Sequence, residues 1–338
     1  MSFINILLLL FPQLIIIFFF SFLLSKKKIS FDVIDNPDNI RKLHDKPTSS
    51  IGGFFILISV LYLLILEIIN FNYLSNDYNF FLEGFRSKIS FYLIGFSFFL
   101  LGYFDDKIDI RSSIKIFLIL FLCYFAQILN NDLTIRALYF SFLENPISLD
   151  KDLGIFFTTF AIMAFINSIN MFDGKNLQIG IYSLVCLFFM IFRLENIILF
   201  SLTLSTIFFL IKNYNGKLFM GNNGTHLVGY ILSFLLIKIY NSAEVFIYAD
   251  EIFILMMLPG IDLIRLFFKR IKKNKNPFHG DLDHLHHILS LKFKNYQIQI
   301  ILLSIVIISL TLFHIINFYI SCFFVLISYT TLIIFCRK

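Results

Sequence analysis

Long apolar stretches alternate with short polar segments along the whole chain. Eleven stretches of 14 to 22 residues contain few charges. A helix needs about 20 apolar residues to cross a bilayer, and somewhat fewer when the membrane adapts. The pattern therefore predicts an all-α, polytopic membrane protein with about eleven transmembrane helices, at 3–24, 51–69, 91–104, 116–130, 154–171, 178–192, 196–211, 226–241, 252–268, 297–314 and 318–336.

Lys and Arg are unevenly distributed between the loops that these helices would separate. With the N-terminus outside, the inner segments carry 21 of these residues and the outer segments carry 5. Cytoplasmic loops are rich in positive charge, which predicts an N-out, C-in orientation. The first stretch precedes Lys26–Lys28 and has no small-residue cleavage site, so we expect a retained helix and not a signal peptide. Every polar motif then lies on the cytoplasmic face.

Composition supports one multi-pass domain over residues 1–338, with the motifs in 34–290. The chain is 58% hydrophobic and only 15% charged, whereas a soluble domain has about a quarter of its residues charged. The net charge of +6 resides mainly in the predicted inner loops, where it attracts anionic membrane lipid. We therefore expect no nucleic-acid partner.

Three carboxylates occur between two predicted spans, in LGYFDDKIDIRSSIK. If this segment is helical, Asp105 and Asp109 are four residues apart and Asp106 and Asp109 are three apart, so all three project toward one edge. Such a set could hold a hard divalent cation or handle protons. The alternative is a solvated helix end with ordinary capping acids.

A second polar motif is NSINMFDGKNLQIG at 167–180. Amide oxygens of Asn167 and Asn170 could ligate a cation, Asp173 could bind a ribose hydroxyl or base edge, and Asn176 follows the turn. The alternative is a helix C-cap followed by a turn, where Asn, Asp and Gly are common.

Two loops could contact a nucleotide or a phosphate. The loop at 34–53 contains Lys46 among several basic donors, and Phe219 lies in a Gly- and Asn-rich segment at 213–229, where it could stack on a base. The alternatives are a loop that only sets topology and a connecting turn.

The last motif, at 259–289, combines a basic run with His284, His286 and His287. Clustered His could bind zinc, but no Cys or wider ligand spacing accompanies them. Binding of a diphosphate by these imidazoles and the nearby Lys and Arg side chains is more consistent than zinc binding with the acidic residues elsewhere in the chain. Together, the motifs suit phosphoryl transfer assisted by Mg²⁺, and the membrane setting implies a lipid phosphate substrate.

The motifs, in their order and spacing, resemble those of the polyprenyl-phosphate N-acetylhexosamine-1-phosphate transferase family, or glycosyltransferase family 4. The matching strings are DNPDNIRKLHDKPTSSIGG, GYFDDKIDI, NSINMFDG and HLHH. The forms of the acidic and His motifs are more similar to the WecA-type branch, which starts surface glycans such as lipopolysaccharide, than to the MraY branch of peptidoglycan synthesis.

The resemblance implies transfer of a sugar phosphate from a UDP-N-acetylhexosamine to undecaprenyl phosphate, with release of UMP, as a first membrane step of cell-envelope glycan synthesis. It also implies Mg²⁺, with Mn²⁺ as a substitute, and a multi-pass protein of the bacterial inner (plasma) membrane. The sugar, the pathway and the oligomeric state, a homodimer included, are left open.

The resemblance also implies roles for individual residues, all named by their number in this chain. Asp105 and Asp106 would be catalytic acids that engage the lipid phosphate and the metal, with Asp105 the candidate for activating that phosphate. The other roles implied are metal binding by Asp106, Asn170 and Asn222; uridine-side binding by Lys46, Asp173 and Phe219; diphosphate binding by His284, His286 and His287; and further substrate contacts by Asp109, Asn167 and Asn176.

Two departures from the family pattern affect these expectations. Asn222 replaces an Asp that ligates metal in the family, so metal affinity should fall and a phospho-aspartate at this position is excluded. Asn176 replaces the second Asp of Asp-Gly-x-Asp-Gly. A catalytically impaired homologue that binds lipid phosphate or nucleotide sugar therefore remains the alternative. A transporter is disfavoured because the acids cluster at one face and not along a path.

Overall fold

The computed structural model describes residues 3–25, 33–35, 47–69, 81–275 and 283–337. The expectation of an all-α fold is confirmed, because the strands of the described residues are only two residues long each. The main helices are α1 (Phe3–Ser25), α2 (Gly53–Ile68), α4 (Gly84–Ile89), α5 (Gly95–Ile108), α6 (Ser112–Leu129), α7 (Lys151–Phe172), α8 (Gln178–Ile191), α9 (Ile197–Asn213), α10 (Gly221–Tyr240), α11 (Ala249–Lys272), α12 (Leu285–Leu289), α13 (Asn295–Ile315) and α14 (Phe318–Arg337).

Each of the eleven predicted stretches coincides with a helix of the described chain, and one was predicted too short. The stretch 91–104 belongs to a continuous helical run, Gly84–Ile108, of 25 residues, in which α4, a π-helical turn (Ser90–Ile94) and α5 follow one another. Among the described residues, six helices are long and apolar enough to cross a membrane and three shorter apolar helices accompany them. The chain is therefore a polytopic membrane protein.

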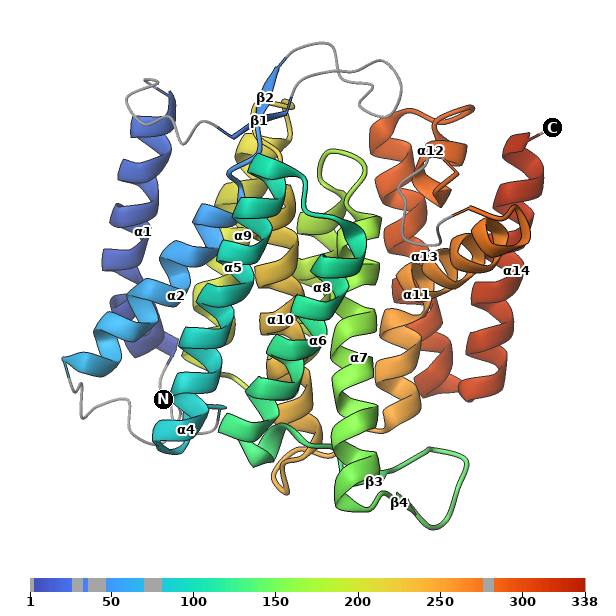
Figure 1. The fold of residues 1–338 in the computed structure, drawn as a ribbon, viewed down its shortest axis with the longest axis horizontal. Coiled ribbons are helices and arrows are strands. Elements are labelled where there is room, and N and C mark those ends of the chain that lie inside the picture. Colours follow the sequence, from blue (N-terminus) through green and yellow to red (C-terminus); the bar gives the residue numbers. More distant parts are fainter. Residues whose placement is uncertain (1–2, 26–32, 36–46, 70–80, 276–282, 338) are drawn as a thin grey trace.

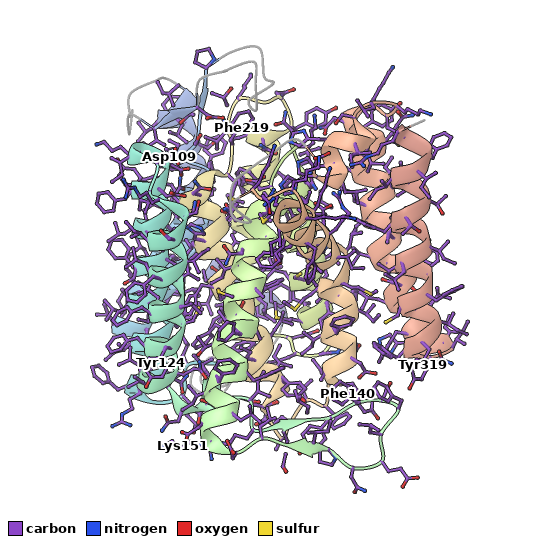
Figure 2. All side chains as sticks on the ribbon, turned by 45° about the vertical axis from the view of Figure 1, so that its right-hand side comes forward. Asp109, Tyr124, Phe140, Lys151, Phe219 and Tyr319 are labelled. Carbon is purple, nitrogen blue, oxygen red and sulfur yellow. The ribbon has the colours of Figure 1, made fainter. Side chains whose placement is uncertain are left out.

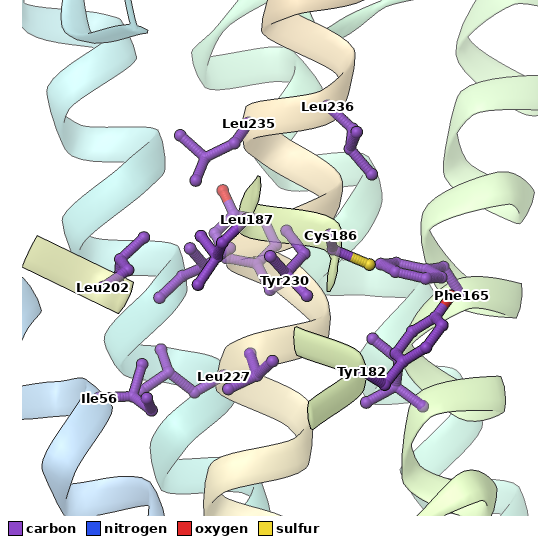
Figure 3. Close-up of a cluster of buried hydrophobic side chains, with 14 of the residues drawn as sticks. Ile56, Phe165, Tyr182, Cys186, Leu187, Leu202, Leu227, Tyr230, Leu235 and Leu236 are labelled. Carbon is purple, nitrogen blue, oxygen red and sulfur yellow. The ribbon is translucent and has the colours of Figure 1, made fainter. Parts of the chain in front are cut away.

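Helix α10 forms the centre of the bundle. Every residue from Asn223 to Tyr240 is buried, and the helix packs against α5, α7, α2 and α8. Figure 3 shows Leu227 and Tyr230 of α10 among buried side chains of several helices. Close approach depends on glycine: a Cβ atom at Gly229 would lie 3.0 Å from the Cα of Ile166 in α7.

The outer helices present apolar side chains away from the bundle. Only 28% of the apolar window of α1, 22% of α6 and 17% of α14 is buried. Phe117, Phe121 and Phe323 are examples of large exposed side chains on these helices. Such surfaces are costly in water and suited to the hydrocarbon core of a bilayer.

The predicted motifs that the structure describes gather at one end of the bundle. Figure 2 shows Asp109 and Phe219 at one end and Lys151, Phe140 and Tyr319 at the other. The antiparallel pair β1 (Ile34–Asp35) and β2 (Thr48–Ser49) and helix α12 lie at the first end, whereas β3 (Ala137–Leu138) pairs with β4 (Ile147–Ser148) at the second (Figure 1). Helix α11 contains Pro259 and bends along its length, so that its second half runs toward α14 (Figure 1).

Candidate active site

Asp106 caps the N-terminus of the central helix. Its Oδ1 accepts the backbone N–H of Asn222 at 2.9 Å, and its Oδ2 accepts the backbone N–H and side-chain amide of Asn223 at 3.1 and 2.7 Å. Gly221 makes this approach possible: its φ is +74°, and a Cβ atom there would lie 2.8 Å from Asp106 Oδ2. The carboxylate therefore faces the positive end of the α10 dipole.

The segment predicted as a Gly-rich loop is in part a helix. Helix α10 begins at Gly221, five residues before the predicted start at 226. The prediction of the helix start was wrong because two glycines and two asparagines have poor helix propensity, which packing on α5 and capping by Asp106 override here.

Asp105 is buried and forms an ion pair with a lysine side chain. Its Oδ2 accepts Lys115 Nζ and Asn222 Nδ2, both at 2.8 Å, and its Oδ1 accepts the backbone N–H of Ile110 at 3.1 Å. Lys115 comes from α6, across the turn that follows α5. Asp105 therefore contributes little uncompensated negative charge, and Lys115 is a site residue that sequence reasoning missed. Its one signal was a lone Lys at the edge of a predicted span.

Asp109 does not join the other two acids. Helix α5 ends at Ile108, and Asp109 adopts the left-handed conformation with φ 51° and ψ 74°. Its side chain is exposed. The expectation that three carboxylates share one helical edge is wrong because it assumed a helix through 109, whereas Asp tolerates the left-handed C-terminal position and ends the helix.

The motif at 167–180 contributes two groups to the site. Asn170 Oδ1 accepts the hydroxyl of Thr225 in α10 at 2.6 Å. Asp173 follows the last turn of α7, and enclosure by protein together with the nearby charge of Asp106 raises the pKa of its carboxyl group to about 7. Asp106 and Asp173 therefore lie close enough to repel each other.

Two other residues of this motif have local roles. The Asn167 amide donates to the carbonyl of Met163 on its own helix at 2.9 Å. The Asn176 carbonyl accepts the side-chain amides of Asn295 and Gln299 of α13 at 3.2 and 3.1 Å. In the structure neither side chain makes a hydrogen bond to the acids of the site.

The raised pKa of Asp173 predicts a pH-dependent stability. Between pH 3.8 and about 7 the folded state retains a proton that the unfolded chain releases, so stability falls as pH rises, by up to about 1.4 kcal/mol per pH unit. Thermal unfolding of the purified protein with EDTA should therefore give a lower Tm at pH 7 than at pH 5.5. Asp173→Asn should flatten this trend, and an identical slope in the variant would contradict it.

Three His side chains form an imidazole cluster, defined here as His284, His286 and His287. The ring centroids of His284 and His286 are 5.4 Å apart with nearly parallel planes, and those of His286 and His287 are 4.3 Å apart. A Cβ atom at Gly174 would lie 1.7 Å from His286 Nε2, so the ring rests directly on the turn after Asp173.

The imidazole of His286 is buried and neutral. Burial, followed by the neighbouring His287 and His284, lowers its pKa well below the usual value. Within the described residues neither of its ring nitrogens has a hydrogen-bond partner. His286 can therefore offer a hydrogen bond to a ligand at neutral pH, but no positive charge.

Phe219 lies beside the described end of the first loop. Its backbone N–H donates to the carbonyl of Ser49 at 2.9 Å, and its carbonyl accepts the N–H of Gly52 at 2.8 Å. The backbone at Phe219 is therefore held by hydrogen bonds to strand β2 and to the residues that follow it. Lys46, the predicted partner from that loop, lies outside the described residues.

The donor set fits a hard cation that is shared with a substrate. The described residues contain no cluster of three or more His, Cys, Asp or Glu side chains able to enclose a metal ion. The mutual repulsion of Asp106 and Asp173 is nevertheless relieved by a cation between them, and Mg²⁺ commonly uses one or two carboxylates plus substrate phosphates. Asn222 directs its amide nitrogen to Asp105, which leaves its oxygen as the only candidate ligand atom on that side chain.

Comparison with known proteins agrees with these motifs. Residues 88–240 match the family model described as glycosyl transferase family 4. This region contains Asp105, Asp106, Asn170 and Asn222.

Curated relatives extend the similarity over most of the chain. The chain is 27% identical over 281 residues to an undecaprenyl-phosphate alpha-N-acetylglucosaminyl 1-phosphate transferase of Thermotoga maritima, covering 82% of this chain and 79% of the relative. Proteins with the same name from Salmonella typhi and Yersinia pestis are 26% and 25% identical over 287 and 282 residues, each covering 79% of this chain and 72% of the relative. The predicted resemblance is confirmed.

Proposed function

Because residues 88–240 match the family model of glycosyl transferase family 4, we propose that the chain belongs to this family and transfers N-acetylhexosamine 1-phosphate from a UDP-sugar to undecaprenyl phosphate. The names of the relatives favour N-acetylglucosamine as the sugar. The reaction would begin a cell-envelope glycan at the cytoplasmic face of a bacterial inner membrane. The orientation in this proposal is N-out and C-in, with eleven spans.

The observation that carries this proposal is the juxtaposition of two coupled acids with an imidazole at one end of a membrane bundle. Asp106 and Asp173 repel each other, and His286 packs on Gly174, the residue after Asp173. A diphosphate is bound well by a divalent cation together with hydrogen-bond donors. The two acids can hold such a cation, and the imidazole can donate a hydrogen bond. The apolar flanks of α1 and α6 suit a lipid-linked substrate.

The chemistry is an in-line displacement at phosphorus. An oxygen of the lipid phosphate forms a bond to the β-phosphorus of the UDP-sugar, and the bond from that phosphorus to the bridging oxygen breaks. UMP leaves with the electron pair. Asp106, Asp173 and the amide oxygens of Asn170 and Asn222 would hold Mg²⁺, which would neutralise charge that develops on the phosphate oxygens. This assigns Asp173 to the metal, whereas the resemblance placed it on the uridine side.

Other residues of the chain would position the two substrates. The Lys115 ammonium, oriented by Asp105, attracts the lipid phosphate, so Asp105 acts mainly through its partner. The ring of Phe219 stacks on the uracil, and Lys46 is assigned to the same nucleotide by the family resemblance alone. The imidazole cluster donates hydrogen bonds to the diphosphate.

A reconstituted assay tests the proposal directly. Purified protein in bilayers is given undecaprenyl phosphate, Mg²⁺ and a panel of UDP-sugars, and UMP release is measured. We expect release with UDP-N-acetylglucosamine, loss of release with EDTA, and recovery with Mg²⁺ or Mn²⁺. Absence of UMP with every UDP-N-acetylhexosamine would contradict the proposal.

The second candidate function is that of a catalytically silent homologue that binds lipid phosphate or nucleotide sugar. Asn222 favours it, because an amide stands 2.8 Å from Asp105 where the family resemblance implies an acid. In the active enzyme, Asn222→Asp should lower the Mg²⁺ concentration for half-maximal rate about tenfold, and in a silent homologue it should create turnover. Asn196→Asp, at the N-cap of α9, is the matched control. Unchanged Mg²⁺ dependence would exclude Asn222 as a ligand.

A further inference from the structure

A buried carboxylate in the last motif, to which the sequence assigned no role, contacts the imidazole cluster. Asp262 of α11 is 3% exposed. Its Oδ2 accepts His284 Nδ1 at 3.0 Å, and its Oδ1 accepts the Tyr329 hydroxyl at 2.6 Å and Arg265 Nη2 at 2.8 Å. Both oxygens also accept the backbone N–H of Leu285, at 3.2 and 3.3 Å. One carboxylate thus joins α11, α12 and α14.

These contacts determine how His284 presents its ring. An ionised carboxylate can only accept hydrogen bonds, so Nδ1 of His284 carries the proton and Nε2 is left for another partner. The bond to Leu285 N–H holds the first turn of α12 in place, because the side chain of His284 makes no capping bond of its own. Ring and backbone of the motif are therefore anchored by the same acid.

The anchored ring leads to the acidic part of the site. His284 stacks on His286, and His286 packs on Gly174 with no room for a Cβ atom. A displacement of His284 would therefore shift the ring that lies beside Asp173. Asp262 itself is held by Arg265, which also donates to the carbonyl of Asp283 at 2.5 Å.

The geometry points to Asp262 as a positioning residue for the imidazole cluster, with Tyr329 of the last helix as its support. Asp262 sets the tautomer and the orientation of His284, and through the stack it sets the place of His286, the ring that meets the diphosphate. This inference rests on the proposed function for the identity of the ligand. It gives α14, which carries no motif, a role in the site.

Steady-state kinetics with a double-mutant cycle test the inference. Asp262→Asn should raise the KM for the UDP-sugar and lower kcat/KM by about 10–100-fold, the range for residues that orient ligating His side chains. The KM for undecaprenyl phosphate should not change. In a His284→Ala background, Asp262→Asn should lower kcat/KM by less than about twofold, because the two residues act as a unit.

Matched variants separate positioning from folding. Asp250→Asn is the control, since Asp250 is an equally buried acid in the first turn of α11, bonded to Ser141 at the opposite end of the bundle. It should leave the KM for the UDP-sugar unchanged. Tyr329→Phe removes only one donor to Asp262 and should give a smaller rise in KM, which keeps the test usable if Asp262→Asn folds poorly. Additive losses in the cycle, or an unchanged KM, would overturn the inference.

A spectroscopic measurement keeps this inference distinct from the proposed function. In protein with ¹⁵N-labelled His, the signal lost in His284→Gln identifies His284, and its shifts should report a proton on Nδ1. Asp262→Asn and Tyr329→Phe should change them, whereas Asp250→Asn should not. Absence of UMP release would overturn the proposed reaction alone, while unchanged His284 shifts in Asp262→Asn would overturn the role of Asp262.

Discussion

Replacing Asp106 with Asn is expected to reduce sugar-phosphate transfer by about 10²–10³-fold. The amide removes a negative charge from the pair with Asp173, and only one of its two terminal atoms can still accept a hydrogen bond from the start of α10. Both changes weaken the binding of a cation and of the phosphates that it holds, at the place where negative charge develops during the reaction. The rate of UMP release at saturating Mg²⁺ measures the effect.

Asp150→Asn provides the matched control for this variant. Asp150 caps α7 by accepting the backbone N–H of Leu153 at 2.8 Å. It precedes Lys151, which Figure 2 shows at the opposite end of the bundle. Asn is as good a cap as Asp, so this variant should transfer at the normal rate. Asp106, in contrast, accepts N–H groups with both of its oxygens, so Asp106→Asn loses an acceptor and should cost about 1 kcal/mol of stability, the typical net contribution of a hydrogen bond. Transfer within twofold of the wild-type rate would remove Asp106 from the site.

Replacing Gly102 with Ala is expected to destabilise the protein by about 3 kcal/mol and to abolish most activity. A Cβ atom at Gly102 would lie 2.1 Å from the backbone oxygen of Asn222 and 2.5 Å from the nitrogen of Asn223. Backbone atoms cannot rotate aside, so α5 and α10 must separate. That separation pulls the start of α10 away from Asp106. Thermal unfolding and UMP release measure the two effects.

Gly95→Ala is the comparison that isolates the cause. Gly95 also lies in α5 and faces α10, two turns before Gly102, but a Cβ atom there would meet only side-chain atoms of Leu227 and Tyr230 at 3.7–3.9 Å. These are ordinary contact distances, so we expect little change in Tm and normal transfer. Equal losses in both variants would show that helix propensity or membrane insertion, and not the contact with Asn222, is responsible.

Much of this architecture could be predicted from the order of residues. Apolar stretches long enough for a bilayer identify helices without knowledge of their neighbours, because each helix satisfies its own backbone hydrogen bonds in lipid. The gathering of the motifs at one end followed from the Lys and Arg count. The stretch 91–104 was predicted too short because Arg86 and Lys88 interrupt the apolar pattern, although the helical run begins at Gly84.

The structure brings Asp105 and Asp106 together at the start of α10. It leaves Asp109 apart from them, so the predicted geometry was wrong at Asp109. Helix periodicity places side chains only while the helix continues, and local sequence does not state whether it ends at 108 or 109. The pairing of Asp105 with Lys115 depends on the angle between α5 and α6, which no spacing rule supplies.

Composition, periodicity and charge are properties of single segments, and they were enough to assign the membrane class, the helices and the motifs. Contacts between segments depend on how helices pack. Packing alone places the Asp106 carboxylate on the α10 N-terminus, seats His286 on Gly174 and brings Tyr329 to Asp262. The physical reason is that these contacts join residues between 67 and 117 positions apart in the sequence. In addition, the contact at Gly174 involves a glycine, which has no side chain that a sequence pattern could detect.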